Sequence, residues 1–444
     1  MPSGSRARKI VLSQLDLIPA ETPAISRAVD ADSFIRTVVL AAVFLLLWLS
    51  FRPFASLAEP PEVTEAGNLA NQIGYLLLFI VLAAWCLAHQ PSRLMLLVRP
   101  LLIATLLWFA LSVVTSWEPA LSARRLAFTL VTLGIAGMVM LVPKNIRHFS
   151  DVLAAVVLIV LLLCYLGVFF APSLSVHQTT DFLEPELVGD WRGVFGHKNQ
   201  ASAAMVAFVF IGLFVAHVRS GVLGAVVVVP AVTFLLFTQS KTSIVMLPLV
   251  LIISAIMVRV RRPAAGIAIA LSGVAIFNIL SVGSIYSEPL RNLLDLVLAD
   301  STFTGRTEVW QFVLDRVIER PITGFGFASF WGTPEVVYGM GGYAIWANMA
   351  GHAHNGYLDL ALTIGIPGAV FVVLWLVVLP LIDFYRCPRD PSTIPLEMLF
   401  LRVCLFAAYA SCFESMLLQE GGAALFLFAA TFGLRLSSIS RVRP

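Results

Sequence analysis

The residues best suited to chemistry lie in a short polar stretch that ends at His354-Asn355. This stretch also contains His352, and an apolar run starts directly after it at Gly356. Because histidine changes charge near neutral pH, His354 is a candidate general base at the mouth of a helix. The alternative is a histidine that only satisfies its own hydrogen bonds. A His-x-His pair also suggests a metal site with His197 as third ligand, but no carboxylate follows at a recognisable spacing, so we expect no metal.

A second polar stretch, Trp191–Gln200, precedes another apolar run. If that run is a helix, its first N–H groups point toward the stretch and favour an anion. Arg192 and Lys198 would add positive charge, and His197 and Asn199 would support the site. The alternative is a basic membrane anchor, which seldom needs the glycine, histidine and asparagine found here. We therefore expect an anion-binding function.

Arg306 opens a predicted amphipathic helix and is followed by Glu308. An arginine at a helix start can hold a phosphate with two parallel hydrogen bonds. The alternative is a solvated charge at a helix cap, with Glu308 as a supporting acid in the first turn. The sequence leaves these two readings open.

Three further basic residues lie beside short turns between apolar runs, namely Lys241, Arg124 and Arg125. Lys241 would meet a phosphate as a point charge, or would only extend toward water. The Arg124-Arg125 pair would either bind substrate or be shielded by Glu118. These residues complete the set of expected pyrophosphate-binding groups.

The composition decides which protein class must position these side chains. The chain has 444 residues, of which 59% are hydrophobic and only 12% are charged. So little charge cannot cover the surface of a soluble enzyme, and it excludes a disordered chain or a nucleic-acid binder. We predict an all-α polytopic membrane protein of about twelve transmembrane helices. The expected spans are 37–51, 71–88, 100–116, 125–142, 150–171, 201–217, 221–238, 244–258, 264–285, 356–380, 396–416 and 422–438.

The orientation follows from the basic residues, most of which fall on the side of the N-terminus. By the positive-inside rule both termini are then cytoplasmic. The prediction is a disordered cytoplasmic tail at 1–36, a transmembrane domain at 37–438 and a cytoplasmic tail at 439–444. Two long outer loops, 172–200 and 286–355, remain.

The larger outer loop should contain amphipathic helices before the tenth span. Apolar residues recur at helical spacing in 290–297, and a second helix is expected over Thr307–Arg320, ended by Pro321. We expect these helices to lie on the bilayer surface with their apolar side down.

Together, the cationic clusters share one face with His354. The ligand that fits them is an anionic lipid head, best a lipid pyrophosphate, and the reaction would be glycosyl transfer without a metal. An ion-coupled transporter or flippase would carry charges at the midplane, and few occur here. Transport of lipid-linked sugars is nevertheless the alternative from another class.

At this point the residues resemble a known family, the O-antigen ligase and polysaccharide polymerase superfamily of bacterial inner membranes. His354-Asn355, nine residues and then Gly365-Ile366-Pro367-Gly368 match its signature. The stretches Gly305–Trp310 and Arg320–Gly326 resemble its long periplasmic loop. Arg192–Asn199 is similar to the exopolysaccharide polymerase branch. The resemblance covers roughly residues 70–435.

The resemblance implies roles and partners. His354 would activate the acceptor, Asn355 would support it, and Arg192 and Arg306 would bind undecaprenyl pyrophosphate, with no metal or nucleotide cofactor. Relatives often have arginine where this chain has Lys241. A lysine cannot form the bidentate pair of hydrogen bonds that an arginine forms with a phosphate.

The leading hypothesis is a polymerase of undecaprenyl-pyrophosphate-linked oligosaccharide repeat units, making exopolysaccharide on the periplasmic face of the inner membrane. The close alternative is a ligase that moves glycan to lipid A core. Expected partners are the lipid-linked oligosaccharide, the growing glycan or lipid A core, membrane lipid, a chain-length regulator and a flippase, and no nucleic acid.

Overall fold

Helices account for the regular structure of this chain. The structure is a computed structural model that describes residues 23–49, 53–58, 69–182, 184–297, 303, 305–339, 351–418 and 422–439. Within these ranges the one β feature is an isolated bridge between Val176 and Trp191. The predicted all-α class is therefore confirmed. Parts of the expected tails and of the larger outer loop lie outside the described residues.

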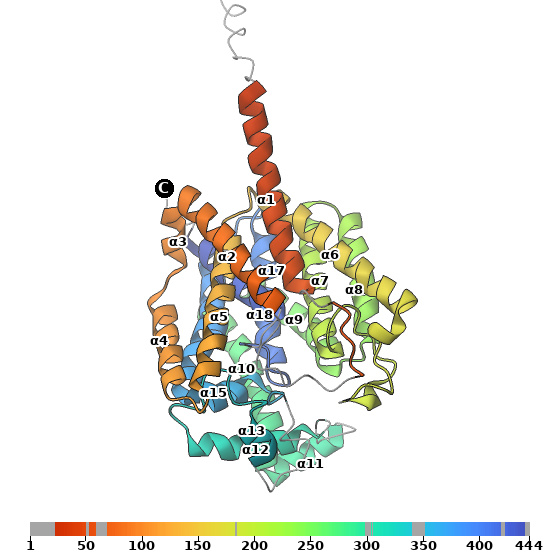
Figure 1. Ribbon diagram of the computed structural model, residues 1–444, viewed down its shortest axis with the longest axis vertical. Coiled ribbons are helices and arrows are strands. Elements are labelled where there is room, and N and C mark those ends of the chain that lie inside the picture. Colours follow the sequence, from red (N-terminus) through yellow and green to blue (C-terminus); the bar gives the residue numbers. More distant parts are fainter. Residues whose placement is uncertain are drawn as a thin grey trace, which may run out of the picture.

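The long helices form one bundle (Figure 1). They are α1 (Pro23–Leu49), α2 (Leu69–His89), α3 (Pro91–Leu97), α4 (Pro100–Val114), α5 (Pro119–Val139), α6 (Ile146–Phe170), α7 (Lys198–Val218), α8 (Gly221–Phe237), α9 (Lys241–Arg259), α10 (Pro263–Ser281), α15 (Gly356–Val373), α16 (Leu379–Arg386), α17 (Ile394–Ala410) and α18 (Gly422–Ile439). One end of the bundle, here called the loop end, carries α11 (Glu288–Val297), α12 (Arg306–Glu319) and α13 (Pro334–Gly339).

Each expected span overlaps a helix, but the expected number of twelve crossings is not confirmed. Within the described residues, eight helices are long and apolar enough to cross a membrane. The pair α3 and α4 would make a ninth, although it bends by 71°. The 17 residues of α8 rise only about 25 Å, less than the roughly 30 Å of a bilayer core. The chain is thus typical of a multi-pass membrane protein.

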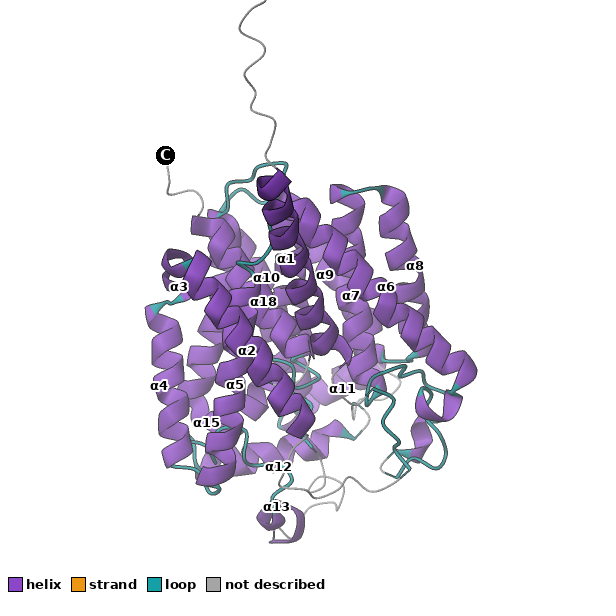
Figure 2. Cartoon of the chain, turned by 45° about the horizontal axis from the view of Figure 1, so that its top comes forward, coloured by secondary structure: helices purple, strands orange, loops and turns teal. Residues whose placement is uncertain are grey.

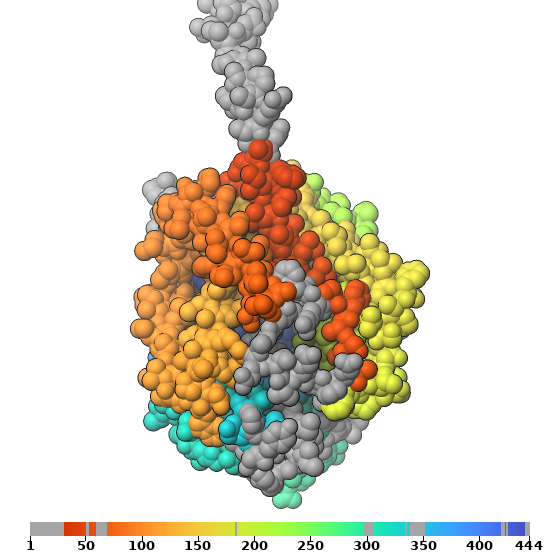
Figure 3. Space-filling model, viewed as in Figure 1, coloured from red at the N-terminus to blue at the C-terminus, as the bar shows by residue number. Residues whose placement is uncertain are grey.

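The expected boundary of the N-terminal tail is wrong. Helix α1 begins at Pro23, so residues 23–36 are helical. Proline suits the first turn of a helix, and the pair Asp32–Arg36, with 2.8 Å between Oδ2 and Nε, supports the next turns. In Figure 3, α1 lies between the surface of α2–α5 and that of α6.

Helices α7 and α17 form the centre of the bundle. The apolar window of α7 is 78% buried, more than that of any other candidate span in the described chain. Helix α7 packs on α6, α8 and α9 (Figure 2). It also packs on α17, which in turn packs on α9 and α18. Their polar ends therefore meet at the loop end.

The apolar face of α12 is covered by protein, which corrects the expectation that it faces the bilayer. Val309, Phe312 and Val313 are fully buried in a second core with Phe325 and Phe330. This loop core is separate from the large core of the bundle. By contrast, α11 exposes 84% of Leu296, so its bilayer contact stays a prediction.

Gly365, in the family motif, marks a break in α15. Its φ of +72° and the position of the Ile322 carbonyl oxygen, 1.9 Å from where a Cβ would lie, both require glycine. Phe325 N donates to Leu362 O, and Gly326 N donates to Thr363 O, each at 2.9 Å. The outer loop is thereby fixed to the helix that follows His354.

Candidate active site

Four chain segments bring polar side chains together at the loop end. They are the start of α7, the start of α12, the turn before α15 and the turn after α17. Helix ends leave backbone groups unpaired, which polar side chains then satisfy. The side chains that meet there surround one carboxylate, Glu414.

Glu414 contacts three of the residues singled out by the sequence. Its Oε1 accepts hydrogen bonds from Arg306 Nη2 at 2.5 Å and from Asn199 Nδ2 at 3.0 Å. Its Oε2 lies 3.4 Å from His354 Nδ1. The glutamate side chain is only 13% exposed, so these contacts form in a largely dry environment.

The charge of Glu414 follows from this environment. Burial alone would raise the pKa of this carboxyl, but the Arg306 guanidinium and the His354 ring outweigh it and hold the pKa far below the usual range. An ionised carboxylate facing Nδ1 favours the His354 tautomer with its proton on Nδ1. Nε2 then keeps a free lone pair, as a general base requires.

The backbone of His354 is held in a left-handed conformation with φ of +49°. Such a conformation is costly outside glycine, so neighbouring contacts must enforce it. Ala353 N donates to Asp359 Oδ1 at 3.0 Å, and His354 N donates to His352 Nδ1 at 3.1 Å. Asp359 also accepts from Trp331 Nε1 at 2.8 Å, which ties this turn to the outer loop.

Asn355 is the N-cap of α15 and follows His354 directly. Its Oδ1 accepts from the backbone N–H groups of Tyr357 and Leu358, at 3.0 and 3.1 Å. Its Nδ2 donates to the carbonyl oxygen of Cys412 at 3.1 Å. Because Asn355 is fully buried, its role is to fix the helix start.

His352, His354 and Glu414 also form a cluster compatible with a metal ion, since one donor atom from each lies within 4.8 Å of the others. The expected third ligand, His197, is not part of it. Two of the possible ligand atoms already accept hydrogen bonds, since His352 Nδ1 accepts an N–H and Glu414 Oε1 accepts from Arg306. A cation would also lie beside the Arg306 guanidinium, whose positive charge opposes its binding.

Arg306 lies in the site as expected. Besides Glu414, it contacts Phe413 O through Nη1 at 2.6 Å, and its side chain is 19% exposed. Glu308 follows it, exposed, in the first turn of α12. Asn199 is held in turn by Ser240, whose Oγ donates to Asn199 Oδ1 at 3.1 Å.

Lys198 and His197 lie in a second polar cluster at the start of α7. Lys198 Nζ pairs with Asp190 Oδ2 at 2.6 Å, and His197 Nε2 lies 2.8 Å from Glu184 Oε2. The hydrogen bond from His197 lowers the pKa of Glu184. Since Lys198 already has a buried anion as partner, its expected role in binding pyrophosphate is not apparent in this arrangement.

Arg192 does not face an open site in this structure, and its expected binding of pyrophosphate stays a prediction. The residue is 1% exposed. It donates from Nη1 to Phe195 O at 3.0 Å and from Nη2 to Ala55 O at 2.8 Å. In this conformation the guanidinium ties the loop after α6 to the segment after α1.

The other three basic residues do not converge on His354 either. Arg124 is exposed on α5, and Arg125 donates to the carbonyl oxygen of Ala328 in the outer loop. Lys241 is the exposed first residue of α9, adjacent to Ser240 and hence at the margin of the site. Of the six expected cations, the structure brings Arg306 to the histidine.

Sequence reasoning missed Glu414, His352 and Asp359 as parts of the site. Glu414 interrupts an otherwise apolar run, and an ionisable residue in such a run is a functional signal. Because Glu414 and His354 are far apart in the sequence, their spacing does not indicate that the two side chains are in contact. His352 was considered only as a metal ligand.

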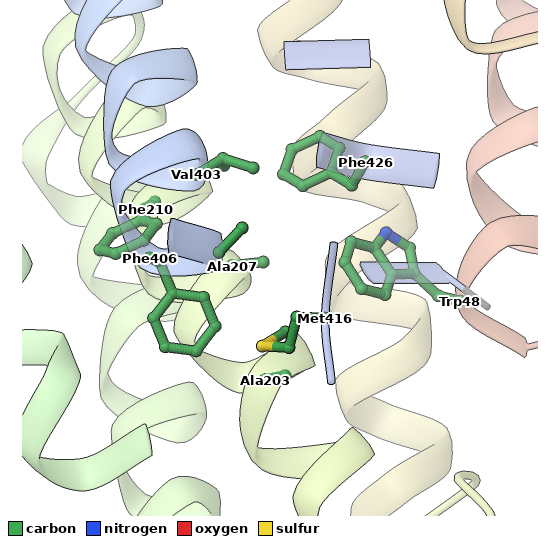
Figure 4. A pocket seen from close by; sticks show the side chains of 9 residues that line it. Trp48, Ala203, Ala207, Phe210, Val403, Phe406, Met416 and Phe426 are labelled. Atoms are coloured by element: carbon green, nitrogen blue, oxygen red, sulfur yellow. The ribbon is translucent and has the colours of Figure 1, made fainter. Parts of the chain in front are cut away.

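A separate small apolar pocket lies in the bundle (Figure 4). Trp48, Phe210, Phe406 and Phe426 are among the side chains that line it, together with Met416, two residues after Glu414. The lining has no ionisable side chain, so this pocket is not where the polar chemistry occurs.

Comparison with known proteins shows which proteins this chain is similar to. Residues 203–373 match the family described as O-Antigen ligase. The Exopolysaccharide production protein ExoQ of Rhizobium meliloti (strain 1021) is 26% identical over 226 residues, or 47% of this chain and 52% of that protein. The chain thus matches about half the length of this relative. These findings confirm the resemblance to the O-antigen ligase and polysaccharide polymerase superfamily, on its exopolysaccharide branch.

Proposed function

We propose that this chain carries the glycosyl-transfer chemistry of the O-antigen ligase and polysaccharide polymerase superfamily. It polymerises undecaprenyl-pyrophosphate-linked oligosaccharide repeat units into exopolysaccharide on the periplasmic face of the inner membrane. The observation that carries the proposal is the pair His354–Glu414 beside Arg306. The similarity to an exopolysaccharide production protein supports the polymerase reading.

In this mechanism His354 Nε2 removes the proton of an acceptor hydroxyl as its oxygen attacks the anomeric carbon of the donor. The new C–O bond forms while the bond from that carbon to the lipid pyrophosphate breaks. The pyrophosphate departs with the electron pair, and the anomeric carbon inverts. Glu414 stabilises the imidazolium that results, as a carboxylate does in other histidine bases.

Arg306 meets the charge that develops on the departing pyrophosphate. A guanidinium has five N–H donors, and two of its nitrogens are held by Glu414 and Phe413 O. The remaining donor capacity is available to phosphate oxygens without giving up the contact to Glu414. Such fixed charge stabilises the leaving group without a metal ion or nucleotide.

A ligase is the second candidate, because the matching family is described as O-Antigen ligase. The same base and guanidinium would serve it, and only the acceptor would change to a sugar of lipid A core. Both reactions need the lipid-linked donor delivered by a flippase, and a polymerase would also work with a chain-length regulator.

The variant His354→Ala tests the proposal and separates the candidates. If the chain is a polymerase, His354→Ala should accumulate single repeat units on the lipid carrier at the outer face. Its rate of polymerisation should fall by at least about 100-fold. Polymerised chains retained on the carrier would instead indicate a ligase, and units held at the inner face would indicate a transporter. The control is His217→Ala, at the opposite end of α7, which should make normal polymer. Full polymer from His354→Ala would refute a catalytic role.

A further inference from the structure

His352 is the one histidine of the active-site cluster to which the proposed mechanism gives no task. Its ring packs against the ring of His354 with centroids 4.1 Å apart and planes inclined by 59°. The residue is half-buried, and its Nε2 makes no hydrogen bond to another residue within the described part of the chain.

The protonation of this ring follows from one hydrogen bond. His354 N donates to His352 Nδ1 at 3.1 Å, so Nδ1 must offer a lone pair and carries no proton. Burial, and next the neighbouring His354, lower the pKa of His352 to about 3, so the ring is neutral at neutral pH. A neutral imidazole without a proton on Nδ1 has it on Nε2. His352 is therefore a fixed donor and cannot act as a base.

The position of this donor limits what it can reach. The two ring centroids are 4.1 Å apart, so a donor on His352 lies beside the proposed base. In an inverting displacement the leaving oxygen is on the opposite side of the anomeric carbon from the attacking oxygen. The hydroxyl that His354 would deprotonate belongs to the acceptor sugar, so the acceptor is the part of the substrate that His352 would meet.

We propose that His352 Nε2–H donates a hydrogen bond to the hydroxyl adjacent to the attacking hydroxyl of the acceptor sugar, and so helps to select the acceptor. This proposal rests on the proposed glycosyl-transfer function. It assigns His352 to substrate recognition, whereas Asp359 and Asn355 only hold the backbone around His354. A site with a fixed donor discriminates against a sugar that lacks the matching oxygen.

Two substitutions separate the donor from the backbone contact. In His352→Asn the side-chain oxygen replaces Nδ1 and can accept from His354 N, but no donor reaches the Nε2 position. In His352→Gln the longer amide places an N–H near the Nε2 position but gives up the acceptor at Nδ1. The matched controls are His217→Asn and His217→Gln, made in an exposed histidine at the other end of α7.

The assay uses the full chain in lipid nanodiscs. Its substrates are lipid-linked repeat units extracted from a strain that lacks this protein. We expect His352→Asn to lose about tenfold in kcat/KM, the worth of one hydrogen bond to a neutral group, and His352→Gln to keep most of it. An active Asn variant with an inactive Gln variant would show that His352 only holds the backbone, and would overturn the proposal. Equal rates in both variants, high or low, would overturn it as well.

The failure of this proposal is distinct from failure of the proposed function. If wild type forms polymer and His354→Ala does not, the function stands whatever the His352 variants do. As a direct check, acceptor repeat units that lack the adjacent hydroxyl should lower the kcat/KM of wild type. With these deoxy acceptors, wild type and His352→Asn should have the same kcat/KM. A difference of about tenfold that persists with the deoxy acceptor would contradict the contact.

Discussion

Asn199 Nδ2 donates a hydrogen bond to Glu414 Oε1 across 3.0 Å, although the two residues are 215 positions apart. The contact joins the first turn of α7 to the turn that follows α17. It places a motif residue of one outer loop on the carboxylate that also contacts Arg306 and His354. Glu414 therefore links three motif stretches that the sequence presents separately.

Glu414→Gln should lower kcat by roughly 100-fold, because a neutral amide cannot stabilise the imidazolium of His354. The KM for the lipid-linked donor should change less, since Arg306 remains in place. Single-turnover rates on extracted repeat units measure both quantities. Glu335→Gln, at an exposed position of α13, is the control and should behave as wild type. A normal kcat in Glu414→Gln would remove the carboxylate from the mechanism.

Arg306→Gln should remove the stability that ionised Glu414 contributes near neutral pH. In wild type the pKa of Glu414 lies below its ordinary value of 4.5, so its contacts contribute stability above that pH and are lost as pH falls through the lowered pKa. Without the guanidinium, burial is no longer outweighed and the pKa of Glu414 rises, so the variant should be less stable than wild type near neutral pH and should approach it as pH falls. Thermal unfolding of the detergent-solubilised chain between about pH 4 and 8 measures this difference.

The control for this measurement is Arg316→Gln on the same helix. Arg316 Nη1 pairs at 2.6 Å with Glu319, which is 45% exposed, and surface pairs contribute little. Its stability should follow that of wild type at each pH. A difference between Arg306→Gln and wild type that does not shrink as pH falls would show that Arg306 does not set the ionisation of Glu414.

Arg192→Lys should reduce stability more than turnover. A lysine cannot donate to Phe195 O and Ala55 O together, and the loss leaves buried carbonyl oxygens unpaired at a cost of about 1–3 kcal/mol. We expect a lower midpoint of thermal unfolding and nearly normal kcat for the protein that remains folded. A normal midpoint with a strongly raised KM for the lipid-linked donor would instead support the pyrophosphate role predicted from the sequence.

Gly365→Ala should disrupt the attachment of the outer loop to α15. The new Cβ would overlap the carbonyl oxygen of Ile322, and alanine disfavours the φ of +72°. A loss of at least about 2 kcal/mol in the free energy of unfolding is expected, together with faster proteolysis of the outer loop. Gly221→Ala is the comparison, because this glycine begins a helix and no other atom lies within 4 Å of the place its Cβ would take. Equal stabilities of the two variants would contradict the steric argument.

Much of the fold could be predicted because backbone groups inside a bilayer must form their hydrogen bonds within the protein. Long apolar runs must form helices, and each expected span does overlap one. The starts of α7, α12 and α15 also follow from local signals, such as the Asn355 cap and Gly305 before Arg306. The covered face of α12 could not be predicted, since contacts with distant segments of the chain decide it. The start of α1 at Pro23 has local causes, but the expected spans are set by apolar runs alone.

The sequence by itself determined the protein class, the motif of His354 and the resemblance to one superfamily, because composition and spacing are local properties of the chain. Only the tertiary structure decided which charges act together. Basic residues look alike in sequence, yet Arg192 is buried against carbonyl oxygens whereas Arg306 reaches the site. Burial and partner geometry fix the charge and function of an ionisable group, and both depend on segments that are distant in the chain.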